Sequence, residues 1–193
     1  MNDSILTADH IDAGYNHKTI VSNVSVTIPQ NKISVILGAN GCGKSTLLKT
    51  FARLLPAQGG HILLDGKQIS EIPSRQLAKT LGLLPQSPVV PEGIRVMDLV
   101  SRGRFPYRQF LKSMTKEDFA AVEEAMEIMG ITELADRAVD ELSGGQRQRV
   151  WIALALAQQT DILLLDEPTT FLDIAYQIEI LDMLTDLNRK HKT

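Results

Sequence analysis

The stretch GANGCGKS, from Gly38 to Ser45, decides the fold of this chain. It follows the apolar run Lys32 to Leu37 and precedes leucines that recur with helical spacing until Pro56, which predicts a strand, a loop and a helix. Glycines let such a loop curl until successive N–H groups point at phosphate oxygens, and the positive end of the following helix attracts the anion. The stretch therefore predicts a phosphate-binding loop.

Two side chains of this loop carry its chemistry. The ammonium group of Lys44 should reach the β- and γ-phosphates of a nucleotide, and the hydroxyl of Ser45 should bind Mg²⁺, which bridges phosphate oxygens. By itself the loop leaves GTPase, kinase and ATPase open. The residues expected to line the nucleotide are Gly38, Ala39, Asn40, Gly41, Cys42, Gly43, Lys44, Ser45 and Thr46.

A pair of acids follows the short apolar run Ile162 to Leu165, which has the character of a buried parallel strand. Asp166 and Glu167 would then lie at the carboxyl end of that strand, where α/β sheets bind their ligands. Asp166 would hold the magnesium ion or its water shell, and Glu167 would polarise the water that attacks the γ-phosphate. An ordinary solvated strand end is the alternative.

Further strands are predicted on either side of the phosphate loop. The β-branched stretches Ser4 to Ala13 and Thr19 to Ile28 indicate a small antiparallel sheet at the start of the chain. Two short strands are expected at 61–64, before the tight-turn pair Asp65-Gly66, and at 81–84.

Helical spacing takes over after residue 86. Thr115 begins a capping-box-like start, and the stripe that follows is expected in the core: Phe119, Val122, Met126 and Met129. Another helix should begin near Ser143 and lead back to the buried strand at 162–165. The last segment, Asp173 to Lys192, is predicted to be amphipathic, with one apolar face: Ile174, Ile178, Leu181, Leu184 and Leu187. Residues 1–86 and 160–193 would form a nucleotide-binding core, and 87–159 an inserted helical subdomain.

Composition narrows the class of partner. With 193 residues, 44% of them hydrophobic, the chain suits one compact domain or a core with a subdomain. The formal net charge of -3 argues against a nucleic-acid-binding surface. Cys42 is the single cysteine, and the first residues lack the pattern of a secretion signal. We expect a cytoplasmic protein that reaches the membrane through another chain, because its apolar runs fall short of the roughly 20 residues that span a bilayer.

The pentapeptide LSGGQ, Leu142 to Gln146, is where the chain resembles the ABC transporter ATPases. The resemblance covers the whole chain, because the other family elements appear in order: Tyr15 before the phosphate loop, Gln86 in LLPQ, Asp166 with Glu167, and Asp173 in TTFLD. It implies an α/β fold with a P-loop NTPase (RecA-like) core, an N-terminal antiparallel β subdomain and an inserted helical subdomain. It also implies ATP hydrolysis, with Mg²⁺ as cofactor.

LSGGQ has the physical character of a second anion site. Ser143 can cap the following helix, and Gly144 and Gly145 leave N–H groups exposed at the positive helix end. In the family, LSGGQ of each subunit closes over the nucleotide held by the other subunit, which implies a head-to-tail dimer with two composite sites. The residues expected on the partner's nucleotide are Leu142, Ser143, Gly144, Gly145 and Gln146.

The resemblance implies roles for three further residues. Tyr15 would stack on adenine, with a turn tyrosine that covers a strand as the alternative. Gln86 would contact the metal and the attacking water, with a polar loop residue as the alternative. Asp173 would lie at the dimer interface and couple the two sites. The implied catalytic residues are Glu167, Gln86 and Lys44, and the implied metal ligands are Ser45, Gln86 and Asp166.

Two stretches indicate the class of transporter. SRGRFPY, Ser101 to Tyr107, and TFLDIAYQIEIL, Thr170 to Leu181, are similar to the ATPases that power import of ferric siderophores, haem and vitamin B12. An iron chelate is the expected cargo, with cobalamin or another small solute as the alternative. The implied complex holds two copies of this chain at the cytoplasmic face of the membrane, two permease subunits and a separate substrate-binding protein.

Functions outside transport are the alternative hypotheses. An ABC ATPase that acts on DNA would place a long coiled coil between the phosphate loop and Asp166, and the sequence leaves no room for one. A translation factor would carry two cassettes in one chain. A non-hydrolysing interaction module is disfavoured because Glu167 is retained.

The family's C-terminal part has no counterpart in this sequence. Members carry, after the helix that follows Asp173, an apolar strand that ends in a switch histidine and lies between the phosphate-loop strand and the Asp166 strand. His191 is a poor substitute, because cationic residues surround it: Arg189, Lys190 and Lys192. We expect the chain to be part of a protein of roughly 250 residues. With two central strand edges unpaired, it should be marginally stable and poorly active alone.

Overall fold

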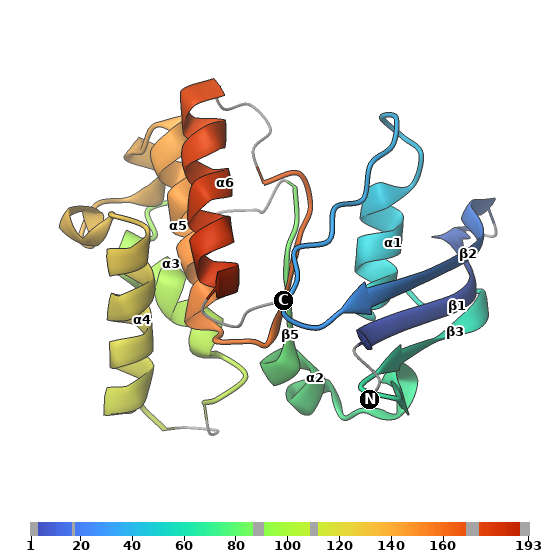
Figure 1. Ribbon diagram of the computed structural model, residues 1–193. Coiled ribbons are helices and arrows are strands. Elements are labelled where there is room, and N and C mark those ends of the chain that lie inside the picture. Colours follow the sequence, from blue (N-terminus) through green and yellow to red (C-terminus); the bar gives the residue numbers. More distant parts are fainter. Residues whose placement is uncertain (1–3, 17, 87–90, 109–111, 169–173, 190–193) are drawn as a thin grey trace. The chain divides into compact units, whose positions relative to one another are not determined.

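The computed structural model describes residues 4–16, 18–86, 91–108, 112–168 and 174–189 (Figure 1). The chain forms two compact units, residues 1–77 together with 184–193, and residues 78–183. The first unit carries the glycine loop, and the second carries LSGGQ and the acid pair. The subdomain boundaries expected at residues 87 and 159 stay predictions.

An antiparallel sheet forms much of the first unit. Asp65 and Gly66 join its last two strands, and their φ angles of 49° and 73° are both positive, as a type I′ turn requires. The predicted N-terminal hairpin and the strand at 61–64 are therefore confirmed. The strands are β1 (Ser4–Tyr15), β2 (Lys18–Pro29), β3 (Gly59–Leu64) and β4 (Lys67–Gln68), in the order β2-β1-β3-β4.

Helix α1 (Lys44–Phe51) follows the glycine loop and packs against β1 and β2. Its last residue, Phe51, is 1% exposed, so the predicted apolar face of this helix is confirmed there. The predicted continuation to Pro56 is wrong. Arg53 explains the early end: its φ is 56°, a left-handed conformation that stops a helix, and its guanidinium donates to the carbonyl oxygen of Ile69 at 2.9 Å.

The predicted strand at Lys32 to Leu37 is not formed. Apolar side chains that alternate along the segment are exposed: Ile33 by 53%, Val35 by 72% and Leu37 by 87%. A strand needs ladder hydrogen bonds and a covered face, and among the described residues no strand pairs with this segment. The strand prediction is wrong here because the apolar pattern supplies side chains without the neighbours that stabilise them. The further strand expected beside it stays a prediction.

The second unit contains two parallel strands, β5 (Leu81–Leu84) and β6 (Ile162–Leu165). Both predicted strands are confirmed. Leu84 pairs with Leu165, and the N–H of Asp166 extends the ladder by donating to the carbonyl oxygen of Leu84 at 3.0 Å. Because the strands are parallel, the residues that follow each of them emerge at the same edge.

Helices make up most of the rest of the second unit. The N-cap of α4 (Lys116–Ile128) is Thr115, whose side chain accepts a hydrogen bond from the N–H of Asp118 in the predicted capping box. α5 (Gly144–Ala157) begins at Ser143, also as predicted. Other helical elements of the described chain are η1 (Ile69–Glu71), α2 (Ser74–Thr80), α3 (Val96–Ser101), η2 (Arg102–Arg104), η3 (Thr132–Leu134), η4 (Val139–Glu141) and α6 (Ile174–Arg189).

The stripe on α4 is only partly in the core. Val122, Met126 and Met129 are buried, which confirms the prediction for these residues. Phe119 is 48% exposed, so its assignment to the core is wrong. Phe119 lies in the first turn of α4, where with Phe105 it lines a pocket of about 360 Å³.

A buried ion pair fastens the start of α4 to η2 and to the end of α5. Nε of Arg104 donates to Oδ1 of Asp118 at 2.9 Å, and both side chains are almost fully buried. Nη1 of Arg104 donates to the carbonyl oxygen of Ala157, and its guanidinium lies 3.8 Å from the ring centre of Tyr107. Burial alone disfavours the carboxylate, yet the Thr115 N–H and the Arg104 guanidinium hold the pKa of Asp118 below its usual value. Part of the SRGRFPY stretch therefore has a structural role.

The last predicted helix is present as α6. Its buried residue is Ile180, at 3% exposure, which does not belong to the predicted apolar face. Three residues of that predicted face are exposed: Ile174 by 76%, Ile178 by 54% and Leu181 by 55%. Asp173 and residues 190–193 lie outside the described residues. Within the described ranges, no helix combines the length and apolar character needed to cross a membrane.

Candidate functional site

The glycine loop makes a tight turn that ends in α1 (Figure 1). The N–H of Cys42 donates to the carbonyl oxygen of Ala39 at 3.2 Å, and the φ angles of Gly41 and Gly43 are 78° and 102°. Glycine adopts such angles without a Cβ clash. A Cβ on Gly38 would lie 2.5 Å from Sγ of Cys42, so the two ends of the loop approach each other closely. The loop thus has the curled backbone that suits a phosphate, followed by the N-terminus of an eight-residue helix.

The ammonium group of Lys44 folds back over this loop. Its Nζ donates to the carbonyl oxygens of Gly38 at 3.1 Å and of Ala39 at 3.2 Å. Phosphate oxygens are stronger, charged acceptors, so a bound nucleotide can replace these carbonyls as the partners of the ammonium. The Ser45 hydroxyl is a hard oxygen ligand of the kind Mg²⁺ prefers. These residues fit a magnesium-bound triphosphate, and their contacts to it stay proposals.

Cys42 is a chemical probe of the loop. It is the single cysteine of the chain and is exposed. We expect N-ethylmaleimide to modify Cys42 and to block nucleotide binding, because the added group would lie within the predicted phosphate-binding loop. Saturating Mg-ATP should slow the modification, which is measured as the rate of mass increase with and without nucleotide. Equal rates under the two conditions would place the thiol outside the nucleotide site.

The second unit brings two of the predicted catalytic residues together. Nε2 of Gln86, just after β5, donates to Oε2 of Glu167, just after β6, at 2.6 Å. Asp166 is 4% exposed and precedes Glu167 directly. The parallel pairing of β5 and β6 explains the arrangement, because both residues follow strands that end at the same edge. A carboxylate held by an amide donor can orient a water and accept its proton, and a carboxylate beside it can hold a cation.

Glu167 has an uncommon backbone conformation. Its φ is 51°, in the left-handed region that residues other than glycine rarely occupy. A backbone conformation of this kind lowers the stability of the folded state by about 1–3 kcal/mol and persists where the surrounding structure holds it, often at functional sites. Sequence reasoning placed the carboxylate but missed this conformation. The proline that follows does not signal it, because a residue before proline favours extended backbone with negative φ.

LSGGQ lies at the start of α5, as predicted. Oγ of Ser143 accepts from the N–H of Gln146 at 3.2 Å, and Oε1 of Gln146 accepts from the N–H of Ser143 at 3.1 Å. The cap on Ser143 is therefore confirmed, and its reciprocal bond from Gln146 was not predicted. A Cβ on Gly144 would meet no atom within 4 Å, and Leu142 is buried below the turn. Contact with a partner's nucleotide stays a proposal.

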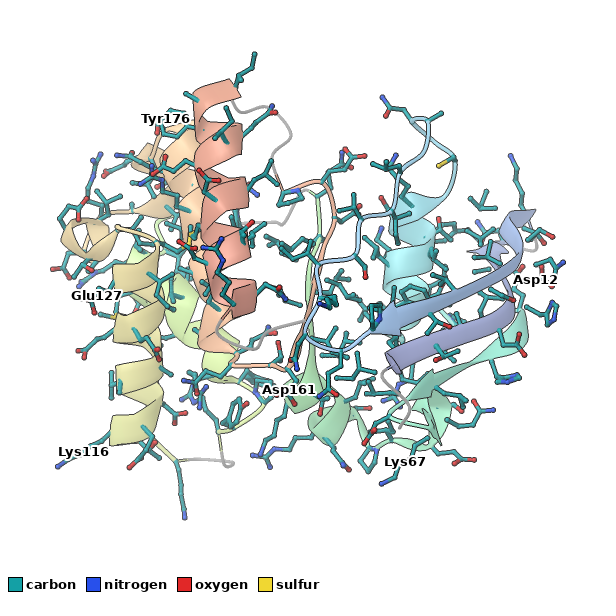
Figure 2. All side chains as sticks on the ribbon, viewed as in Figure 1. Asp12, Lys67, Lys116, Glu127, Asp161 and Tyr176 are labelled. Atoms are coloured by element: carbon teal, nitrogen blue, oxygen red, sulfur yellow. The ribbon has the colours of Figure 1, made fainter. Side chains whose placement is uncertain are left out.

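Two residues that closely follow LSGGQ, Gln148 and Arg149, make contacts that sequence reasoning missed. Nε2 of Gln148 donates to the carbonyl oxygen of Pro168 at 2.6 Å. Nη2 of Arg149 lies 2.7 Å from Oε2 of Glu179 on α6, and its guanidinium lies 5.6 Å from the ring centre of Tyr176. Figure 2 labels Tyr176 on α6, beside the first turn of α5. The helical spacing of apolar residues predicts the helices that carry these side chains. It does not predict which residues, distant in sequence, the side chains contact.

Tyr15 ends β1, and its side chain is 44% exposed. The same hairpin reaches the phosphate loop, because the side chains of Ile20 and Val21 in β2 lie against Gly43. An exposed ring in this hairpin can stack on a base, and that role stays a proposal. The predicted interface residue Asp173 lies outside the described residues.

Comparison with known proteins identifies relatives over nearly the whole chain. Residues 21–170 match a family model described as ABC transporter. The probable siderophore transport system ATP-binding protein YusV of Bacillus subtilis (strain 168) is 52% identical over 190 residues, which cover 98% of this chain and 69% of that protein. The ferric enterobactin transport ATP-binding protein FepC of Escherichia coli (strain K12) is 49% identical over 185 residues, which cover 96% of this chain and 68% of that protein.

Solved structures share the fold. A protein described as a metal-chelate type ABC transporter, in an inward-facing conformation, is 30% identical and superposes with a TM-score of 0.84 over 99% of this chain and 71% of that one. The fold is that of a P-loop NTPase with a β subdomain. It combines the glycine loop before α1, the two strands that present Gln86 and Glu167, and the antiparallel sheet. This chain belongs to the ABC transporter family.

Proposed function

We propose that this chain is the ATP-binding subunit of an ABC importer, and that ATP binding and hydrolysis drive uptake of a ferric siderophore or related iron chelate through a separate membrane permease. The observation that carries the proposal is the 52% identity to a siderophore transport ATP-binding protein over 98% of this chain. The geometry of the phosphate loop, of the Gln86–Glu167 pair and of the capped LSGGQ helix supports it.

In the proposed reaction, the glycine loop and Lys44 bind the terminal phosphates of ATP. Ser45, Gln86 and Asp166 hold Mg²⁺ or its water shell. A bound Mg²⁺ would offset the negative charge that develops on the phosphate oxygens during transfer. Glu167 accepts a proton from the attacking water, and the Gln86 amide keeps the Glu167 carboxylate oriented.

Two copies of the chain act as a head-to-tail dimer in this proposal. LSGGQ of one copy closes over the nucleotide of the other, and the open helix N-terminus at Gly144 supports that use. Tyr15 stacks on adenine, and Asp173 lies at the interface. The dimer binds two permease subunits at the cytoplasmic face of the membrane, and a substrate-binding protein delivers the chelate. Nucleic acid is not a proposed partner, because the formal net charge is -3.

The transported substrate can be tested in cells of the source organism. Deleting the gene should abolish uptake of one labelled iron chelate, identified from a panel of ferric siderophores that also includes haem, and leave uptake of labelled cobalamin unchanged. Full-length wild-type protein should restore uptake, whereas the Glu167→Gln variant should not, because the cycle needs hydrolysis. Loss of cobalamin uptake in place of iron uptake would contradict the iron proposal. Co-purification with nucleic acid and without a permease would contradict transport itself.

A further inference from the structure

We propose that Gln148 is a positioning residue that couples the LSGGQ helix to the backbone around Glu167 within one chain. Closure of LSGGQ over a partner's nucleotide then sets the Glu167 carboxylate that serves the chain's own nucleotide. The inference rests on the proposed function, because it takes Glu167 as the base and LSGGQ as the anion site. Gln148 acts through Pro168 and not on the reacting atoms.

The contact that carries the inference joins two elements that are separate in sequence. Gln148 lies in the first two turns of α5, two residues after the last residue of LSGGQ. Its Nε2 donates to the carbonyl oxygen of Pro168 at 2.6 Å in a partly buried setting. A hydrogen bond shielded from water is stronger than an exposed one, so this bond resists breaking when α5 moves. A displacement of α5 is therefore transmitted to the carbonyl group of Pro168.

Proline transmits the restraint to Glu167 because it is stiff. The pyrrolidine ring fixes the φ of Pro168 near −65°, and the peptide bond between Glu167 and Pro168 is planar. Few free torsions therefore separate the carbonyl that Gln148 holds from the Cα of Glu167. The φ of Glu167, 51°, lies in a region that is kept only where neighbours enforce it. Gln148 supplies one such restraint.

Gln86 supplies a different restraint on the same residue. Its amide holds Oε2 of Glu167 at 2.6 Å, so Gln86 orients the carboxylate while Gln148 fixes the backbone that follows it. Misplacing a reacting group by about 1 Å can cost on the order of a hundredfold in rate. Loss of either restraint should therefore lower the rate of hydrolysis more than the affinity for ATP.

The LSGGQ end of α5 is also tied to α6. Arg149 pairs with Glu179 at 2.7 Å, and its guanidinium lies over the Tyr176 ring. The start of α5 is thus held from two sides, and Gln148 is its described contact with the segment that follows β6. Coupling of this kind is reciprocal, so the state of the Glu167 site also changes the affinity of LSGGQ for the partner's nucleotide.

The test uses the full-length protein assembled with its permease and compares two substitutions of Gln148. Gln148→Leu removes the donor and keeps the approximate size, and Gln148→Glu is isosteric but has no N–H. Both should lower kcat for ATP hydrolysis by about tenfold or more and change KM by less than about twofold, because the phosphate loop is untouched. Gln76→Leu, the same change at an exposed position of α2, should leave kcat unchanged.

A double-mutant cycle separates coupling from packing. Ser143→Ala removes the cap of the LSGGQ helix, and its effect on kcat should be much smaller in the Gln148→Leu background than in wild type. Three results would each overturn the inference. The first is that the effects of Ser143→Ala and Gln148→Leu on kcat multiply independently. The others are a wild-type kcat in both Gln148 variants, and a loss of kcat in Gln148→Leu that Gln148→Glu does not show. A wild-type complex without ATPase activity would instead refute the proposed function.

Discussion

Replacing Glu167 with Gln is expected to slow ATP hydrolysis by at least about a hundredfold while ATP binding is retained. Gln has the shape of Glu, and its amide oxygen can still accept the hydrogen bond that Nε2 of Gln86 donates at 2.6 Å. The lost element is the group that accepts a proton from the attacking water. Phosphate release by the full-length protein with its permease, at saturating ATP, measures the effect.

The same variant has a second expected outcome. Because ATP binds without being hydrolysed, ATP-bound dimers should accumulate, and size-exclusion chromatography in Mg-ATP should detect them. Glu127→Gln makes the same chemical change on the exposed face of α4, where Figure 2 labels the residue, and should hydrolyse ATP at the wild-type rate. Wild-type turnover by Glu167→Gln would remove Glu167 from the base role.

Sequence predicted the elements whose signals are local. Thr115 and Ser143 were recognisable as helix starts because a cap needs only residues within one turn. β5 and β6 were found as short apolar runs with clear ends, and the turn at Asp65 needs only two residues with positive φ. The helix caps and the turn are stabilised by residues within a few positions of them. The two strands were predictable because each is short and uniformly apolar.

Features that depend on distant partners were not predictable. The bond from Gln86 to Glu167 joins residues 81 positions apart, and it follows from the parallel register of two strands. The segment at 32–37 has the alternation of a strand, yet its state depends on neighbours that its own residues do not specify. Phe119 fits helical spacing, yet it is 48% exposed and lines a pocket most of whose other residues come from distant parts of the sequence.

Replacing Lys44 with Ala is expected to abolish measurable ATP binding. The variant removes the cationic donor to the terminal phosphates, and charge-assisted bonds of this kind are about twice as strong as neutral ones. Binding is read from the rise in melting temperature with nucleotide. ATP at a hundred times its Kd stabilises the folded state by about 2.7 kcal/mol, and the variant should lose that stabilisation.

The contacts of Lys44 with Gly38 and Ala39 require a control, because the ammonium group also holds the loop itself. The loop keeps backbone restraints without Lys44, since the N–H of Leu47 donates to the carbonyl oxygen of Gly43 at 2.9 Å. We therefore expect the nucleotide-free melting temperature of Lys44→Ala to stay within a few degrees of wild type. Lys67→Ala removes the same charge from exposed β4 and should keep the full ATP-dependent rise. An unchanged rise in Lys44→Ala would show that GANGCGKS does not bind the phosphates.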